Sequence, residues 1–294
     1  MTESTSEPQP SEPLTDAKPE SRRRRLLIRS LRITGVVVAL WLLAAYIVLP
    51  ALWKHYEHQP SLEDAPKTTL TSQGIPGDPL NVGFIGSEEE LTHALLETGW
   101  HPADPVTLRS SIKIAGSVVF NRAYAAAPVS NLFVFGRKQD LAFEKEEGKS
   151  ASHRHHVRFW KSVELGRKEL PLWIGAITFD RSVGLSHTTA QITHHIGPDV
   201  DAERNLLMGE FSKGGWLTEI YQVTGVGATV LGRNGGGDPY YTDGELSIGL
   251  LASASDPRLE TKRLDNPIAV QLKEQLWSAL RPLLKSLPQG GSDD

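Results

Sequence analysis

Three histidines and two arginines share eight residues of this chain, HRHHVRFW, at positions 153–160. The stretch also has the branched and aromatic residues of a β-strand, in which successive side chains point to opposite faces. One face would carry His153, His155, Val157 and Phe159, and the other Arg154, His156, Arg158 and Trp160. Because Val157 and Phe159 are apolar, we expect their face to meet the core.

The face with His153 and His155 could bind a metal ion. Their i, i+2 spacing allows one strand to offer two imidazoles, but a third ligand must come from elsewhere in the chain. Candidates for that ligand are His194, His195 and Asp180. The pattern H-x-H is common, so the identity of any metal or other cofactor stays open.

The face with Arg154, His156 and Arg158 predicts anion binding, because guanidinium groups match phosphate and carboxylate oxygens in bidentate geometry. His156, between the two arginines, could act as a nucleophile, an acid or a base. The alternative is a solvated sheet face whose charges form cross-strand ion pairs.

A second polar cluster lies in ITFDRSVGLSHTTAQITHHIGPD, residues 177–199. Asp180 and Arg181 would end one strand, and His187 would lie in the following loop. His194 and His195 would end the next strand. A rigid scaffold often presents reactive groups at such strand ends and loops. Asp199 is a candidate N-cap of the helix that follows, and a candidate partner that orients a histidine.

A third cluster is GRNGGGDPYYTDG, residues 232–244. Its three consecutive glycines permit backbone conformations closed to other residues and let a ligand approach closely. Asn234, Asp238 and Tyr240 would line such a loop with hydrogen-bonding groups. The Lys-Ser/Thr ending of a phosphate-binding P-loop is missing, and a flexible hairpin loop is the alternative.

The elements that must position these clusters are mostly strands. Short β-like runs follow one another from residue 132 to 196 with no helix-length segment between them, which favours antiparallel pairing. We expect helices after Ser87, within 105–124, over about 200–212 and over 266–287, the last with an apolar stripe packed on the sheet. The predicted fold class is therefore α+β, a largely antiparallel β-sheet with flanking helices, preceded by one transmembrane helix.

The transmembrane helix is the strongest single signal. Residues 33–53, ITGVVVALWLLAAYIVLPALW, are uncharged and long enough to cross a hydrocarbon core, and they follow an arginine cluster. We expect a disordered tail over 1–32, a spacer over 54–77, a globular domain over 78–287 and a disordered end over 288–294. The positive-inside rule predicts a single-pass membrane protein with a cytoplasmic amino terminus and a periplasmic or extracellular domain.

Charge and composition exclude several classes of function. Residues up to Arg32 hold seven Lys and Arg against five Asp and Glu, so with −4 for the whole chain the remainder carries −6. An acidic domain has no electrostatic case for binding nucleic acid. The chain has no cysteine, which excludes disulfides, thiolate metal sites and a cysteine nucleophile.

Several blocks taken in order resemble the LssY carboxy-terminal domain family. They are GWHPADPVTLRSS, NLFVFGRKQDLAFEK, RHHVRFW, LWIGAITFDRSVGLSHTTAQITHHIGPDVDAER and GRNGGGDPYYTDGE, and the similarity spans about residues 78–255. In that family the domain stands alone behind a membrane anchor or is fused to lipid-phosphatase and DedA-like membrane modules. The resemblance implies no settled activity, and this chain lacks the phosphatase module.

Two functions remain open from the sequence. The first is a hydrolase acting on a phosphorylated lipid or another anionic envelope substrate. In it His156 and His195 act as acid, base or nucleophile, Asp180 or Asp199 orients a histidine, and Arg154, Arg158 and Arg181 hold the anion. The second is a noncatalytic module that binds a lipid headgroup, a glycan or a protein partner. Chemistry requires that residues 153–158, 180–187 and 194–199 meet in one pocket.

Overall fold

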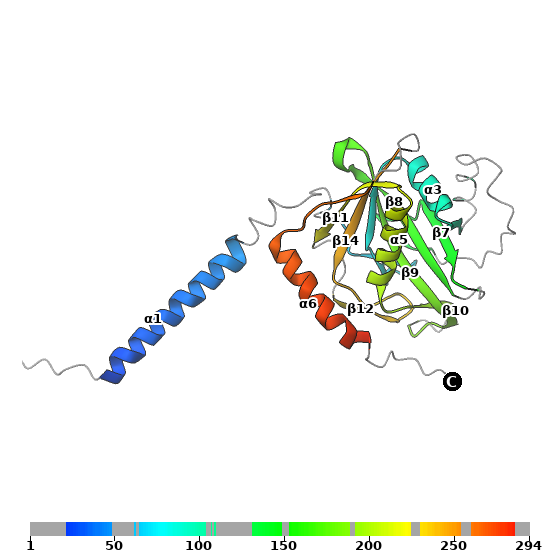
Figure 1. Ribbon diagram of the computed structural model, residues 1–294. Coiled ribbons are helices and arrows are strands. Elements are labelled where there is room, and N and C mark those ends of the chain that lie inside the picture. Colours follow the sequence, from blue (N-terminus) through cyan, green and yellow to red (C-terminus); the bar gives the residue numbers. More distant parts are fainter. Residues whose placement is uncertain are drawn as a thin grey trace, which may run out of the picture. The chain divides into compact units, whose positions relative to one another are not determined.

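The computed structural model describes residues 22–48, 62, 65–103, 107, 109, 131–148, 153–188, 192–224, 230–253 and 260–285 (Figure 1). The chain forms two units, Met1–His55 and Tyr56–Asp294. The helix expected within 105–124 lies outside the described residues apart from Thr107 and Arg109, and so do residues 1–21 and 288–294 of the expected tails. Residues 22–32, expected in the disordered tail, are instead part of a helix.

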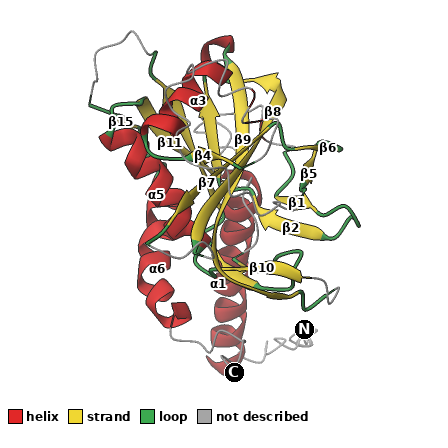
Figure 2. Cartoon of the chain, turned by 90° about the vertical axis from the view of Figure 1, so that its right-hand side faces the viewer, coloured by secondary structure: helices red, strands yellow, loops and turns green. Residues whose placement is uncertain are grey.

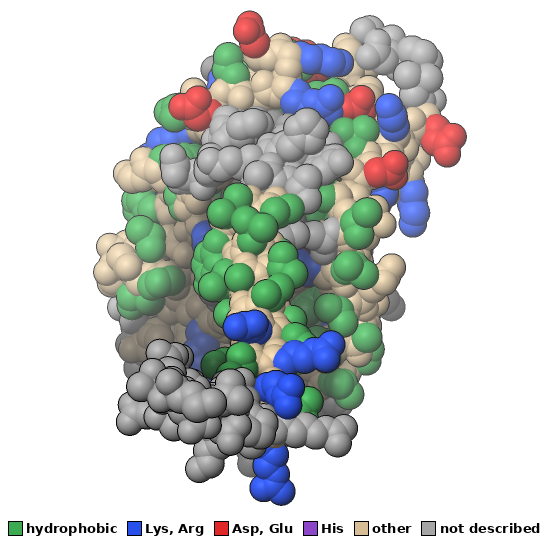
Figure 3. Space-filling model, turned by 90° about the vertical axis from the view of Figure 1, so that its left-hand side faces the viewer, with side chains coloured by type: hydrophobic (Ala, Val, Ile, Leu, Met, Phe, Trp, Pro, Cys, Tyr) green, Lys and Arg blue, Asp and Glu red, His purple; other side chains and the backbone are tan. Residues whose placement is uncertain are grey.

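The first unit contains one long helix. Helix α1 (Arg22–Leu43) continues into a short π-helical segment, Ala44–Val48. The stretch Arg23–Val48 is long and apolar enough to cross a membrane, and its side chains are exposed almost throughout. Hydrophobic side chains in green and Lys and Arg side chains in blue are visible together on the face shown in Figure 3. The expected span begins inside this helix, and residues 49–53 lie outside the described residues.

The second unit is built on a mixed sheet. Within the described residues it has nine strands in the order β15–β11–β14–β3–β9–β8–β7–β4, with β10 paired to β9. Their bounds are β3 Val82–Ile85, β4 His101–Pro102, β7 Leu141–Glu146, β8 Arg154–Leu165, β9 Pro171–Leu185, β10 Ile192–Ile196, β11 Leu217–Thr224, β14 Glu245–Leu251 and β15 Lys262–Arg263. Only the β14–β3 and β11–β15 pairs in this described sheet are parallel, which confirms the α+β class.

Two small sheets complete the strands. One has the order β2–β1–β5–β6, from β1 (Thr68–Leu70), β2 (Pro76–Pro79), β5 (Phe133–Val134) and β6 (Arg137–Lys138). The other pairs β12 (Leu231–Arg233) with β13 (Pro239–Tyr241). Residues 68–77, expected in the spacer, therefore belong to the folded unit. The alternation of Pro and polar residues in this stretch gave no indication of strand β1, in which Thr69 is fully buried.

Each face of the main sheet has its own core. Helices α3 (Glu88–Glu97) and α5 (Val200–Lys213) pack on one face, where Val157, Phe159 and Phe211 belong to one apolar cluster. On the other face Trp160, Ile174 and Leu132 belong to a second cluster beneath the small sheet. Figure 2 shows α5 and the β1–β2–β5–β6 sheet on opposite sides of the main sheet.

The helix starts follow the expected capping signals. Ser87 and Glu90 form a capping box at α3, and the Asp199 side chain accepts a hydrogen bond from the Ala202 N–H at α5. A short 3₁₀ turn, Arg167–Glu169, connects β8 to β9.

The last helix departs from its expected packing. Helix α6 (Ile268–Lys285) was predicted to lay its leucine stripe on the sheet, but Leu272, Leu276 and Leu280 are exposed. Its Val270 is buried, and Trp277 donates a hydrogen bond to Asp201. The prediction was wrong because it assumed that the apolar face of a helix must be its buried face.

A buried ion pair holds α5 to the β13–β14 connection. The Arg204 guanidinium donates to both carboxylate oxygens of Asp243 at 2.6 and 2.7 Å and to the Glu245 carbonyl at 2.9 Å. Arg204 is only 2% exposed, so removing Asp243 would take the bidentate partner from a buried charge and leave Asp201, 3.5 Å away, as its remaining carboxylate.

We predict that Asp243→Ala lowers the free energy of unfolding by about 3–5 kcal/mol, because the buried Arg204 charge loses both hydrogen bonds to the Asp243 carboxylate. Urea unfolding of the full chain in detergent measures this. The control is Arg137→Ala, which breaks the half-exposed pair with Asp140 and should cost about 0–1 kcal/mol. Equal effects of the two variants would contradict the prediction.

Candidate functional site

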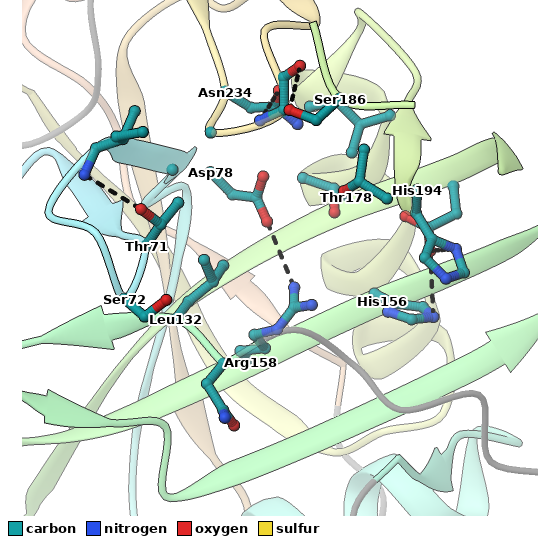
Figure 4. A pocket seen from close by; sticks show the side chains of 18 of the residues that line it. Thr71, Ser72, Asp78, Leu132, His156, Arg158, Thr178, Ser186, His194 and Asn234 are labelled. Carbon is teal, nitrogen blue, oxygen red and sulfur yellow. Dashed lines mark hydrogen bonds and ion pairs between the residues drawn. The ribbon is translucent and has the colours of Figure 1, made fainter. Parts of the chain in front are cut away.

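A polar cavity of about 310 Å³ opens between the main sheet, the β1–β2 hairpin and the loop that carries the three glycines. Strands β8 and β9 provide its floor through His156, Arg158, Thr178 and Asp180. Asp78 from β2, His194 from β10 and Asn234 from the glycine loop approach from above (Figure 4). Residues from the segments 153–158, 180–187 and 194–199, which a hydrolase would need in one pocket, therefore line the same cavity.

Strand register explains why the floor is polar. Strands β8 and β9 pair Arg154 with Asp180, His156 with Thr178 and Arg158 with Ala176. Alternate residues of two paired strands share a face, so the even-numbered polar residues line the cavity while Val157 and Phe159 enter the opposite core.

Asp180 is the centre of the charges on the floor. Its Oδ2 lies 2.9 Å from His194 Nδ1, 3.5 Å from His156 Nε2 and 3.8 Å from Arg154 Nε. The His194 contact has an ion-pair distance but not the alignment of a hydrogen bond. Burial opposes the charged carboxylate, yet His194 and the neighbouring positive charges keep the pKa of Asp180 below its usual value. Asp180 is therefore ionised near neutral pH.

His156 is held neutral beside that carboxylate. Its side chain is 3% exposed, and burial lowers its pKa to about 3 despite the opposing charge of Asp180. The positive charges of Arg158 and Arg154 lower it further. An imidazole with this pKa stays unprotonated near neutral pH, so it neither supplies nor takes up a proton there, but one ring nitrogen can still accept a hydrogen bond.

Two acids that the sequence analysis did not select balance the arginines. Arg158 Nη1 lies 3.4 Å from Asp78 Oδ2, and Arg154 Nη1 lies 3.1 Å from Glu144 Oε2. Burial raises the pKa of both Asp78 and Glu144, although the paired arginines oppose this. Glu144 is opposite His156 in the β7–β8 register, a signal that strand pairing alone could have provided. Asp78 was hidden at the edge of the expected spacer.

Several buried nitrogens of the floor have no hydrogen-bond partner among the described residues. They are Nε of Arg154, Nε of Arg158 and Nε2 of His156. A buried donor without an acceptor costs free energy, so such a group is a natural place for a ligand oxygen.

His195 belongs to a second, adjacent cluster. Its Nδ1 lies 2.7 Å from Oδ1 of Asp238, which is fully buried, and His187 Nε2 lies 3.9 Å from the same oxygen. The other Asp238 oxygen accepts from the Ile196 N–H at 3.1 Å. Gly237 has φ +90, and a Cβ there would lie 2.7 Å from Cβ of His187, so glycine lets this loop approach the histidine.

Comparison with known proteins now decides the family. The sequence model described as "LssY C-terminus" matches residues 62–246, more than half of the chain. The chain belongs to this family. Searches of curated proteins and of solved structures each returned no match. The matched segment of this LssY C-terminal domain begins before β1, in agreement with the folded position of residues 68–77.

The structure assigns the predicted residues of the LssY domain to separate places. Arg154, His156, Arg158, Asp180, His194 and Asn234 surround the cavity or its ion pairs, as expected for a polar site. His195, Asp238 and His187 form the neighbouring cluster instead. Arg181 is half-buried, and its Nε has no hydrogen-bond partner among the described residues.

Asp199 does not orient a histidine. Its carboxylate caps α5 and binds Arg281 at 2.7 Å and Lys285 at 3.3 Å, both from α6. Proximity in sequence to His195 suggested a histidine partner, but as the N-cap of α5 the Asp199 side chain contacts α6 instead. Tyr240, expected in a binding loop, is 4% exposed and packs with Ile196 and Val200 in a small apolar cluster.

The expected metal ligands do not converge. His155 points to the α5 side of the sheet, where its Nδ1 is 2.5 Å from Oε2 of Glu203, and His153 stacks on Phe179. His194 faces the cavity on the other side. The described residues whose ligand atoms do approach within 4.8 Å of one another are His187, His195 and Asp238. Two imidazoles and a carboxylate suit zinc, and the half-exposed His187 leaves one side open to solvent.

We predict that this second cluster binds divalent zinc or its spectroscopic substitute cobalt. Co²⁺ added to the full chain in detergent should produce visible absorption bands, and His187→Ala should weaken binding at least tenfold. His153→Ala, which removes an exposed histidine from another place, is the control. Bands that persist unchanged in His187→Ala would refute the assignment.

A second prediction concerns His155. Burial disfavours its charged form, but the hydrogen bond and charge of Glu203 raise the pKa of His155 above its ordinary value. A group with a raised folded-state pKa stabilises the fold below the unfolded pKa of about 6.5, and this contribution is lost as pH rises through the folded pKa.

The loss of unfolding free energy caused by Glu203→Gln should therefore be largest near pH 5 and should decrease as pH rises. Urea unfolding at several pH values measures it. Glu219→Gln is the control, because its partner Arg167 keeps its charge over this range. A loss that is the same at every pH for Glu203→Gln would contradict the prediction.

Proposed function

We propose that the domain binds a phosphorylated lipid or another anionic envelope molecule in the cavity and hydrolyses it. The observation that carries this proposal is the convergence of buried, unpartnered donors from Arg154, Arg158 and His156 beside the Asp180–His194 pair. Such donors can bind phosphate oxygens, while His194 of the adjacent pair accepts and returns a proton.

The contacts support distinct roles for these residues. Arg154 and Arg158 hold the anion through nitrogens that the carboxylates leave available. With a proton on Nδ1 facing Asp180, His194 Nε2 accepts a hydrogen bond from Arg154 Nη2 at 3.3 Å, and a bound anion would take the place of Nε2 as the partner of Arg154. The freed Nε2 takes a proton from a water molecule as the water oxygen attacks phosphorus. The P–O bond to the alcohol breaks, and the protonated His194 returns that proton to the leaving oxygen. His194 thus replaces His195 as the first candidate for the reactive histidine.

The location of this chemistry follows from helix α1. Arginines on its amino-terminal side favour retention of that end in the cytoplasm, so the domain would face the periplasm or the cell exterior. There the cavity would meet envelope lipids or their headgroups.

A noncatalytic binding module is the second candidate. Two observations favour it: the arginines are already paired with Asp78, Glu144 and Asp180, and a histidine pKa of about 3 excludes His156 as an acid near neutral pH. Such a module would hold a headgroup, a glycan or a protein partner without changing it.

Phosphate release by the full chain in detergent, from phosphorylated lipids and small phosphoesters, tests the proposal. We expect turnover that falls about 10²–10⁴-fold in His194→Ala, the range for loss of acid–base catalysis. His153→Ala is the matched control, because His153 stacks on Phe179 outside the cavity. The assay is run with and without Zn²⁺, so that the second histidine cluster is occupied in one arm.

Binding of a labelled phospholipid to the same preparations separates the two candidates. Binding that Arg158→Ala abolishes, without turnover in wild type, would reject the hydrolase and favour the binding module. The absence of both binding and turnover would reject an anion site in this cavity.

A further inference from the structure

Helix α6 presents its apolar face away from the domain. Ile268, Leu272, Leu276, Leu280 and Leu283 are 75, 54, 67, 53 and 62% exposed. Their spacing of three and four residues aligns them along one face of the helix. A surface helix of a globular domain normally has the opposite orientation, with its apolar stripe toward the core.

Polar contacts fix this orientation. Trp277 Nε1 donates to Asp201 Oδ2 at 2.9 Å, Arg281 binds both oxygens of Asp199, and Lys273 pairs with Glu245 at 2.6 Å. The Asp201 and Glu245 residues are each 1% exposed. Rotating α6 to bury the leucines would break these contacts and remove a donor from each of two buried acids, so the exposed stripe is a stable feature of the fold.

We propose that the leucine face of α6 lies on the surface of the lipid bilayer that contains α1. The inference rests on α1 being a membrane span, and it is independent of any activity of the cavity. A helix with an apolar face and a polar opposite face binds in the plane of the headgroups, with its apolar side chains about 5–10 Å deep.

The short linker keeps the second unit near the bilayer. Residues 49–61 separate Val48, at the end of the candidate span, from Leu62 in the second unit. Thirteen residues extend at most about 45 Å, so the domain is held close to the membrane at all times.

Charge and shape also favour a bilayer. Lys262 and Arg263 are exposed just before the helix, where they can meet anionic headgroups. The stripe is one helix wide, whereas a stable interface with a second copy buries about 800 Å² on each partner.

Because the chain contains no cysteine, a single introduced cysteine reports on one position. Leu276→Cys and Leu280→Cys in the full chain, each labelled with an environment-sensitive fluorophore, are reconstituted into phosphatidylcholine–phosphatidylglycerol vesicles. Val163→Cys, 83% exposed on β8, is the matched control. Unchanged circular dichroism establishes that each variant is folded.

We expect blue-shifted emission at both α6 positions and at least twofold quenching by lipids that carry a doxyl group on the upper acyl chain. The Val163→Cys label should show neither effect. A water-like spectrum at both α6 positions would overturn the proposal. A blue shift without quenching by doxyl lipids would also overturn it, because the label would then be covered by protein, such as a second copy.

Discussion

Pairing of β8 with β9 separates the chemistry of this domain from its core. The two strands lie side by side in the sheet, so each residue is committed to one of two faces by its position in the register. Arg154, His156 and Arg158 occupy one face over the first half of β8, and Val157 and Phe159 occupy the other. A shift of one residue would place Arg158 in the apolar core and Phe159 in the cavity, and both the site and the fold would be lost.

Burying so many charges requires that they neutralise one another. In the cavity and beside it the acids Asp78, Glu144 and Asp180 pair with two arginines, and on α5 Arg204 is bound by Asp243. Low dielectric strengthens each attraction, but every charge must first lose its hydration. Burial, reinforced by the two arginines, lowers the pKa of His156 and keeps this histidine neutral. The balance of charges also means that a ligand anion must compete with carboxylates already in place.

The adjacent residues His194 and His195 illustrate how one strand serves two clusters. They point to opposite sides of β10, so one pairs with Asp180 in the cavity and the other with Asp238 in the glycine loop. The two clusters meet along the segment 234–238, because Asn234 and Gly236 line the cavity while Asp238 holds His195. A cation in the second cluster would therefore lie next to an anion in the first. The proposed contact of α6 with the bilayer would hold the same domain near lipid.

The sequence by itself determined the features that depend on local pattern. The candidate membrane helix follows from a long uncharged run, the α+β class from short strands without crossover helices, and the α3 and α5 starts from Ser87, Glu90 and Asp199. Strand alternation also identified Arg154, His156 and Arg158 as residues of one face. Ordered blocks of motif were sufficient to recognise the family.

Only the tertiary structure decided which partners these residues meet. Asp199 binds α6, some 82 residues away, rather than a nearby histidine, and His155 meets Glu203 on the face opposite the cavity. Asp78 reaches the site from a strand that the sequence pattern did not show, and Glu144 reaches it through the pairing of β7 with β8. The outward leucines of α6 could not be foreseen either, because periodicity reveals that a helix has an apolar face but not what that face contacts. Pairwise contacts between distant segments depend on how the sheet is assembled, and a local pattern carries no record of that assembly.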